Sequence, residues 1–141
     1  MTRYVCRLLF APTLMVAFAT LVKGYAETGD GFAAGVIAAL AFVMQFVAFG
    51  ERDVRRMLHT RYAPAIAVIG LALALVVTFV PVLMGAPILT HSPPPNAAVV
   101  HLGTVELITA FAFDVGVFLL VVGFSVTSLS LVGRAEAWEA Q

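Results

Sequence analysis

Two acidic residues, Asp114 and Glu106, stand in an otherwise apolar stretch of the chain between residues 105 and 132. If this stretch is a membrane helix, Asp114 lies about nine residues into it, roughly 14 Å deep at 1.5 Å per residue and thus near mid-depth. A charged Asp there costs about 2.5–3.5 kcal/mol on the insertion scale, so it needs a functional or structural reason. Three roles are open for Asp114: a proton or cation carrier, a structural acid bonded to a neighbouring helix, or a group lining hydrated space. Glu106 lies two turns outward and is rotated from Asp114 by only about 80° at 100° per residue, so the two acids could line one ion path. Its position near the membrane surface also fits a solvated or loop-bound acid.

Other residue types that do chemistry are few. His91 and His101 flank a long connection, but no third ligand stands at a fixed spacing, so we predict no metal site. Cys6 is the only cysteine, which excludes an internal disulfide or a thiolate cluster within one chain. No phosphate-binding loop, Ser/His/Asp set or redox motif occurs. The sequence therefore predicts neither an enzyme nor a bound cofactor.

The composition indicates which solvent surrounds the few polar residues. Hydrophobic residues make up 62% of the 141-residue chain and charged residues 11%, whereas soluble domains average about 45–50% and about 25%. A chain of this length has too much surface for its volume to bury that excess in water. Its net charge of zero leaves no electrostatic footprint for nucleic acid. We therefore predict an all-α integral membrane protein.

Four stretches reach the length of about 20 apolar residues that a membrane helix needs. They cover residues 5–22, 32–49, 62–84 and 105–132, with a proline-rich outer loop over 85–103. We read them as one membrane domain spanning residues 1–141. The first stretch, with Arg3, Arg7 and the sequence Ala17-Phe18-Ala19 near its end, also resembles a signal peptide with its cleavage site. We expect it to be retained as a helix.

The Lys and Arg residues predict the orientation, because they accumulate in short cytoplasmic segments. All but one of the eight fall in the N-terminal segment, the connection between the second and third stretches, or the C-terminal tail. These residues are Arg3, Arg7, Arg52, Arg55, Arg56, Arg61 and Arg134. The exception is Lys23. Both termini are therefore expected in the cytoplasm, which requires an even number of spans.

Small residues predict how the helices pack, since helices in lipid associate where small side chains permit close approach. The glycines expected at helix contacts are Gly31, Gly35, Gly70, Gly116 and Gly123. Gly70 belongs to a third-stretch series with Ala63, Ala67, Ala74 and Thr78, and Gln45 lies on the side of the second-stretch glycines. The last stretch has two small or polar faces, so we expect it between its own bundle and another subunit. Alternatively, its Ser and Thr side chains bond to their own helix backbone.

Two segments resemble a known family, the B subunit of Mrp-type cation/proton antiporters, also called Mnh, Sha or Pha. Residues 24–35 read GYAETGDGFAAG and resemble the family segment GHxxPGGGFxxG between the first two helices. Residues 108–119 read ITAFAFDVGVFL and resemble TPxxFDIGVYL in the last helix. Tyr25 and Thr28 replace the family's His and Pro, and Ala110 replaces a second Pro.

The resemblance implies an accessory or interface subunit of a multi-subunit antiporter in a bacterial or archaeal plasma membrane. Its implied partners are the other subunits and the lipid bilayer, with sodium (or another monovalent cation) and protons exchanged by the whole complex. Asp114 lies in the matching motif, but the family assigns this subunit no catalytic task to carry over. A stand-alone small ion transporter and a non-transport membrane scaffold remain alternatives. A stand-alone carrier needs several paired charges in its own bundle, and this sequence has one deep charge.

Overall fold

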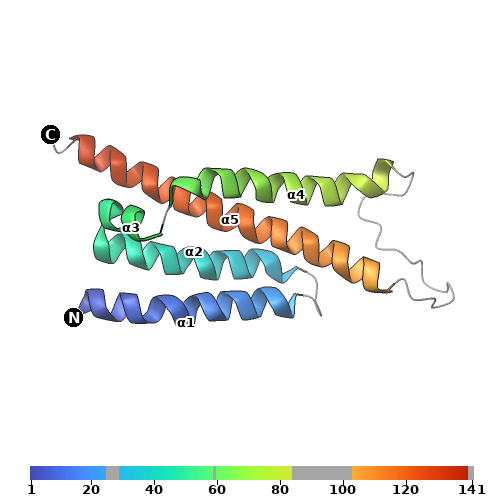
Figure 1. The fold of residues 1–141 in the computed structure, drawn as a ribbon, viewed down its shortest axis with the longest axis horizontal. Coiled ribbons are helices and arrows are strands. Elements are labelled where there is room, and N and C mark those ends of the chain that lie inside the picture. Colours follow the sequence, from blue (N-terminus) through green and yellow to red (C-terminus); the bar gives the residue numbers. More distant parts are fainter. Residues whose placement is uncertain (25–28, 59, 84–102, 140–141) are drawn as a thin grey trace.

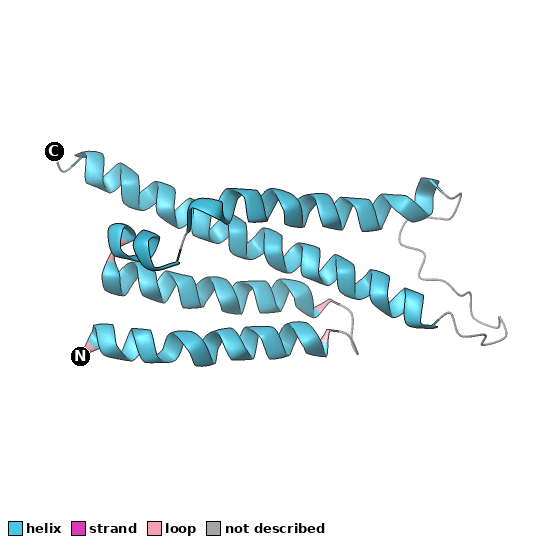
Figure 2. Cartoon of the chain, viewed as in Figure 1, coloured by secondary structure: helices cyan, strands magenta, loops and turns pink. Residues whose placement is uncertain are grey.

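The computed structural model describes residues 1–24, 29–58, 60–83 and 103–139, of which residues 57–58, 81–82, 103–109 and 136–139 are described without their side chains. The described part is helical apart from short caps and turns (Figure 2). Its helices are α1 (Thr2–Lys23), α2 (Asp30–Phe49), α3 (Glu51–Leu58), the 3-10 turn η1 (Thr60–Tyr62), α4 (Ala63–Leu83) and α5 (Gly103–Glu139). The predicted outer loop lies almost wholly outside the described residues.

Four of these helices are long and apolar enough to cross a membrane. Their spanning windows are Thr2–Lys23, Asp30–Phe49, Thr60–Val80 and Ala110–Ala135. Between 11% and 39% of each window is buried within the chain, so most of the span surface needs lipid or other protein around it. The prediction of an all-α protein with four apolar helices of membrane-spanning length is confirmed.

The four long helices form a row rather than a closed bundle, in the order α1, α2, α5, α4 (Figure 1). Helix α5 packs against both α2 and α4, and α2 also packs against α1. Within the described residues, α1 contacts α5 only slightly and does not contact α4. The start of α1, the end of α5 and helix α3 lie at one end of the molecule (Figure 1). This arrangement agrees with an even number of spans and leaves the cytoplasmic orientation a prediction.

The expected position of α5 between its own bundle and another subunit is wrong for the faces that carry small residues. One of these faces is covered by α4 and the other by α2, both from the same chain. Two small-residue faces identify a helix with two neighbours, but the pattern cannot distinguish a neighbour in the same chain from one in another subunit. The last helix is the centre of the row, inserted between helices that precede it in sequence.

Helix α3 was not predicted, because its charged residues lower the hydropathy on which the span prediction rests. Its residues nevertheless favour a helix: Glu51 and Asp53 stand in the first turn, and Arg55 and Arg56 in the last, which complements the helix dipole. Val54 is 1% exposed and anchors the helix. The segment interpreted as a connection with orientation charges is thus a short helix docked on the bundle.

Helix α5 runs past its predicted end at residue 132 to Glu139. The extension contacts α3, where Oε1 of Glu51 lies 3.5 Å from Nε of Arg134. A Cβ on Gly133 would stand 2.8 Å from Cβ of Glu51, so glycine there permits the close approach of α3. The polar end of α5 is therefore packed against α3 rather than left as a free tail.

Candidate functional site around Asp114

Asp114 lies on α5 opposite the beginning of α2 and is 3% exposed. The backbone N–H of Gly29 donates a hydrogen bond to Oδ2 of Asp114 over 3.1 Å. Gly29 is the N-cap residue of α2 and has a φ of 113°, a left-handed conformation that glycine adopts without steric cost. The first N–H groups of a helix lack helical acceptors and carry a positive partial charge. The carboxyl group of α5 therefore supplies the acceptor that caps the start of α2.

Glycines let α5 approach this helix start closely. A Cβ on Gly31 would collide with the backbone of Asp114, and a Cβ on Gly24 would stand 3.1 Å from Oδ2 of Asp114. Further along α2, a Cβ on Gly35 would stand 2.9 Å from Cβ of Val121. The predicted pair Gly31 and Gly35 thus faces α5, with Asp114 at one end of the contact.

An ion pair joins the start of α2 to the end of α1. Nζ of Lys23, the last residue of α1, lies 3.8 Å from Oδ2 of Asp30, the first residue of α2. The two side chains are 63% and 30% exposed, so water screens this ion pair and it contributes little to stability. The start of α2 is therefore in contact with a buried carboxyl group of α5 and with an exposed ion pair to the end of α1.

The mid-depth position expected for Asp114 from counting along its own stretch stays a prediction, but the structure places this residue relative to its neighbouring helices. It is level with the start of α2 and the end of α1, whereas Gly116, two residues on, packs beside Ala74 within α4. Helices α4 and α5 extend past α1 and α2 at this end (Figure 1). Counting along one helix cannot show how its neighbours are offset. Asp114 is central with respect to α4 and terminal with respect to α1 and α2.

The remaining predicted glycines lie at the contact between α4 and α5. A Cβ on Gly70 would stand 2.6 Å from the carbonyl oxygen of Gly116, and one on Gly116 would stand 2.9 Å from the backbone nitrogen of Ala74. A Cβ on Gly123 would stand 2.5 Å from the backbone nitrogen of Ala67. The two helix backbones are therefore in direct contact along the small-residue series of α4.

Glu106 lies within α5, but its side chain is outside the described residues, so a shared ion path with Asp114 stays a prediction. His91 and His101 also lie outside them. Among the residues that the structure does describe, no three His, Cys, Asp or Glu side chains gather as they would to hold a metal ion. The candidate site in the described part of the chain is therefore one buried carboxyl group, that of Asp114 on α5, beside the start of α2.

A family model described as a domain related to the MnhB subunit of the Na+/H+ antiporter matches residues 1–127. The chain belongs to this family. It is similar to the B subunit of the Na+/H+ antiporter of Bacillus subtilis, with 33% identity over 123 residues that cover 87% of this chain and 85% of the relative. The corresponding B subunit of Alkalihalophilus pseudofirmus is 31% identical over 136 residues, which are 96% of this chain and 90% of the relative.

A third relative, from Rhizobium meliloti, is named as the A/B subunit of a probable K+/H+ antiporter. It is 33% identical over 125 residues, which are 89% of this chain but 12% of the relative. The resemblance found from residues 24–35 and 108–119 is confirmed, and both segments fall within the matched residues. As a member of the MnhB family with four candidate spans, the chain is a multi-pass membrane component of a transporter and not an enzyme.

Sequence patterns missed two partners in this MnhB-family chain. Gly29 belongs to the first motif, but the sequence did not identify its N–H group as the donor to Asp114. The pattern that could have indicated this is a glycine directly before Asp30, the acidic first residue of α2. Gln45 turns towards α1, where its Nε2 donates to the carbonyl oxygen of Cys6 over 2.7 Å. Helix α2 lies between α1 and α5, and the hydropathy pattern does not show which of these two helices the side chain of Gln45 contacts.

The alternative reading of the polar residues of α5, that they bond to their own helix backbone, is confirmed for Thr127 and Ser130. Oγ1 of Thr127 donates to the carbonyl oxygen of Gly123 over 2.6 Å, and Oγ of Ser130 donates to that of Thr127 over 2.8 Å. On α4, Oγ1 of Thr78 donates to the carbonyl oxygen of Ala74 over 2.8 Å. These hydroxyl groups satisfy themselves within their helices, so they do not mark a contact with another subunit.

Proposed function

We propose that this chain works as the B subunit of a multi-subunit antiporter that exchanges sodium or another monovalent cation for protons, and that it serves there as an interface subunit. The match of the MnhB-family model to residues 1–127 supports the antiporter assignment. The observation that carries the interface role is the open row of helices, in which α1 and α4 each have one long neighbour. Most of their surface is left for other subunits and lipid.

The side chains on these outer helices support this role. Large apolar residues are strongly exposed on α1 and α4, including Leu8 at 76%, Phe18 at 64%, Val68 at 65% and Ile69 at 60%. Such surfaces are stable only in lipid or against other apolar protein. A neighbour is suggested by the Rhizobium meliloti relative, in which the matched region is one part of a chain named as an A/B subunit. A fused pair keeps its two parts adjacent, so we propose that one direct neighbour is an A-type subunit.

Asp114 has a structural role in this proposal. In the part of the chain that the structure describes, it is the only acidic or basic residue that is buried. Its carboxyl group caps α2 through Gly29, which gives the acid a reason to be there without ion transport. A stand-alone carrier needs several paired charges in its own bundle, and one buried carboxyl group that already accepts a hydrogen bond does not provide them.

Co-purification tests the interface role. An affinity tag on this chain should bring down an A-type subunit, together with further hydrophobic subunits, in mild detergent. Deleting the chain should abolish cation-dependent proton flux in everted vesicles, and restoring it should recover that flux. Exchange catalysed by the chain alone in liposomes would instead identify a stand-alone transporter. Full flux in the deletion strain would leave only a scaffold role.

Cysteine labelling tests the orientation, with both termini proposed to be cytoplasmic. In a Cys6→Ala background, Ser92→Cys should react with an impermeant maleimide in intact cells, whereas Asp53→Cys should react only after the membrane is opened. The reverse pattern would show that the orientation is inverted.

A further inference from the structure

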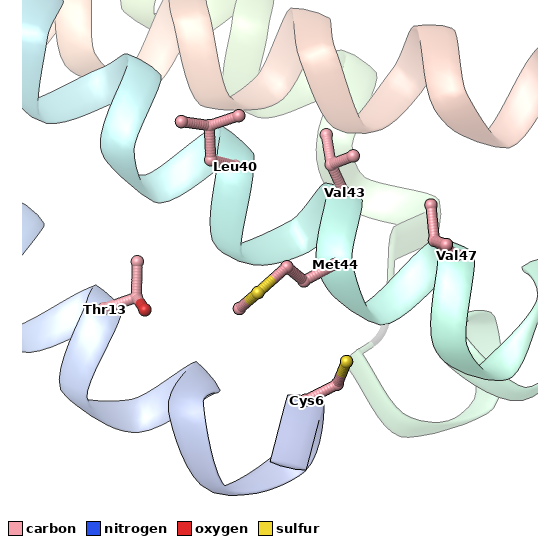
Figure 3. A pocket seen from close by; sticks show the side chains of 6 residues that line it. All are labelled: Cys6, Thr13, Leu40, Val43, Met44 and Val47. Atoms are coloured by element: carbon pink, nitrogen blue, oxygen red, sulfur yellow. The ribbon is translucent and has the colours of Figure 1, made fainter. Parts of the chain in front are cut away.

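A groove of about 300 Å³ lies between α1 and α2 (Figure 3). It is lined by Cys6, Thr13, Leu40, Val43, Met44 and Val47. The hydroxyl group of Thr13 donates to the carbonyl oxygen of Leu9 over 2.8 Å, so this residue presents no free donor to the groove. The lining is therefore apolar in effect, and it comes from these two helices alone.

The guanidinium group of Arg3 contacts residues that lie beyond the Val47 end of the groove. Arg3 lies one turn before Cys6 on α1, and its Nε–H donates to the carbonyl oxygen of Ala48, the residue after Val47, over 3.2 Å. Its Cζ atom lies 6.0 Å from the ring centroid of Phe49. These two contacts hold the guanidinium group in position and use one of its five N–H donors. Among the side chains that the structure describes, no carboxylate pairs with Arg3.

We propose that this groove binds one acyl chain of an anionic phospholipid and that the headgroup phosphate binds the free N–H groups of Arg3. The planar guanidinium fork matches phosphate geometry and forms charge-assisted hydrogen bonds with it. Basic pockets beside membrane helices recognise anionic headgroups in this way. The site goes beyond the antiporter assignment and does not depend on it.

The side chains that line the groove favour a lipid chain over a helix of another subunit. The helix contacts of α5 in this chain are made where glycine and alanine let backbones meet, as at Gly70 and Gly116. The α2 side of the groove carries Leu40, Val43, Met44 and Val47 instead, so another backbone cannot approach closely. Met44 projects between the two helices (Figure 3), and its flexible thioether can adjust to a chain that enters.

The only cysteine of the chain reports directly on occupancy, because Cys6 lines the groove. The rate at which a neutral, membrane-permeant maleimide alkylates Cys6 can be followed by mass spectrometry, with the intact complex in nanodiscs of phosphatidylcholine alone or mixed with phosphatidylglycerol. Bound anionic lipid should slow the alkylation by about fivefold, as expected when the site is mostly occupied. Arg3→Gln should abolish the difference between the two lipid mixtures.

Two controls separate the site from general effects of an anionic membrane. Leu8→Cys in a Cys6→Ala background places the thiol at a similar height on an exposed face of α1, since Leu8 is 76% exposed. Its alkylation should respond little to phosphatidylglycerol. Arg52→Gln removes an equal charge from α3 and should leave the protection of Cys6 intact.

Three results would overturn the proposal. Equal rates for wild-type Cys6 in both mixtures would show that no anionic lipid occupies the groove, and this comparison needs no variant to fold. Slow alkylation in both mixtures would show that another subunit covers it. Equal loss of protection in Arg3→Gln and Arg52→Gln would assign the effect to surface charge.

Discussion

Helices α4 and α5 contact each other through their backbones, whereas the contact between α1 and α2 includes specific side-chain interactions. The first contact has Gly70 beside Gly116 and Gly123 beside Ala67, with no room for a single added carbon. The contact between α1 and α2 has the hydrogen bond from Gln45 to the carbonyl oxygen of Cys6. It also has an edge-to-face pair of Phe10 and Phe42, whose ring centroids are 5.5 Å apart. Because lipid provides no hydrophobic drive between helices, each contact depends on its own packing and bonds. A backbone contact should tolerate change far less than a side-chain contact.

Gly70→Leu should have the largest effect, because its Cβ alone would stand 2.5 Å from the backbone nitrogen of Leu120. The helices must separate to admit the side chain, at a cost of about 3 kcal/mol. We expect the thermal stability of the purified complex and its yield to fall sharply. Val76→Leu, at a position that is 57% exposed on the same helix, is the matched control. Wild-type stability in Gly70→Leu would break the backbone-contact description.

Asp114→Ala should have the next largest effect, about 1–2 kcal/mol, because the N–H of Gly29 loses its acceptor. Asp114→Asn keeps an acceptor oxygen and should be closer to wild type. Thermal unfolding of the complex, followed by size-exclusion chromatography, compares the two variants. If Ala is as stable as wild type, Asp114 does not serve as a cap.

Gln45→Met should cost less, about 0.6 kcal/mol, which is a typical value for a side-chain hydrogen bond between membrane helices. The carbonyl oxygen of Cys6 lies inside α1 and can still bond within its helix after the substitution. The same unfolding measurement checks this. A loss as large as that of Gly70→Leu would remove the contrast between the two contacts.

Glu51→Gln should have the smallest effect, about 0.5 kcal/mol, since the Arg134 and Arg55 partners are 45% and 49% exposed. The effect should shrink further at high ionic strength because salt screens exposed charges. Unfolding at low and high salt measures both. A large effect independent of salt would indicate that Glu51 secures α3 by packing rather than by charge.

Hydropathy and small-residue spacing were enough to predict four spans and the residues at which helices approach. Each of these two properties can be read from one helix alone. A span needs about 20 apolar residues to cross a bilayer, and Gly70 or Gly123 permits close approach because it has no side chain. The motif containing Asp114 also indicated the family, because its residue types and their order along one helix are distinctive by themselves.

Features that involve two helices together were not predicted. The row order places α5 between α2 and α4, and the sequence contains no sign of which earlier helix it joins. The offset of α1 and α2, which puts Asp114 beside a helix start, is likewise a property of packing. Helix α3 was missed because docking through Val54, rather than hydropathy, stabilises it.

The structural role of Asp114 is tested most directly by cation-dependent proton flux in everted vesicles that contain the Asp114→Asn complex, normalised to the amount of assembled complex. Asn keeps the hydrogen-bond acceptor for Gly29 and removes the group that can carry a proton. A structural acid predicts flux per assembled complex close to that of wild type. A fully assembled complex without flux would contradict this and assign Asp114 to the ion path.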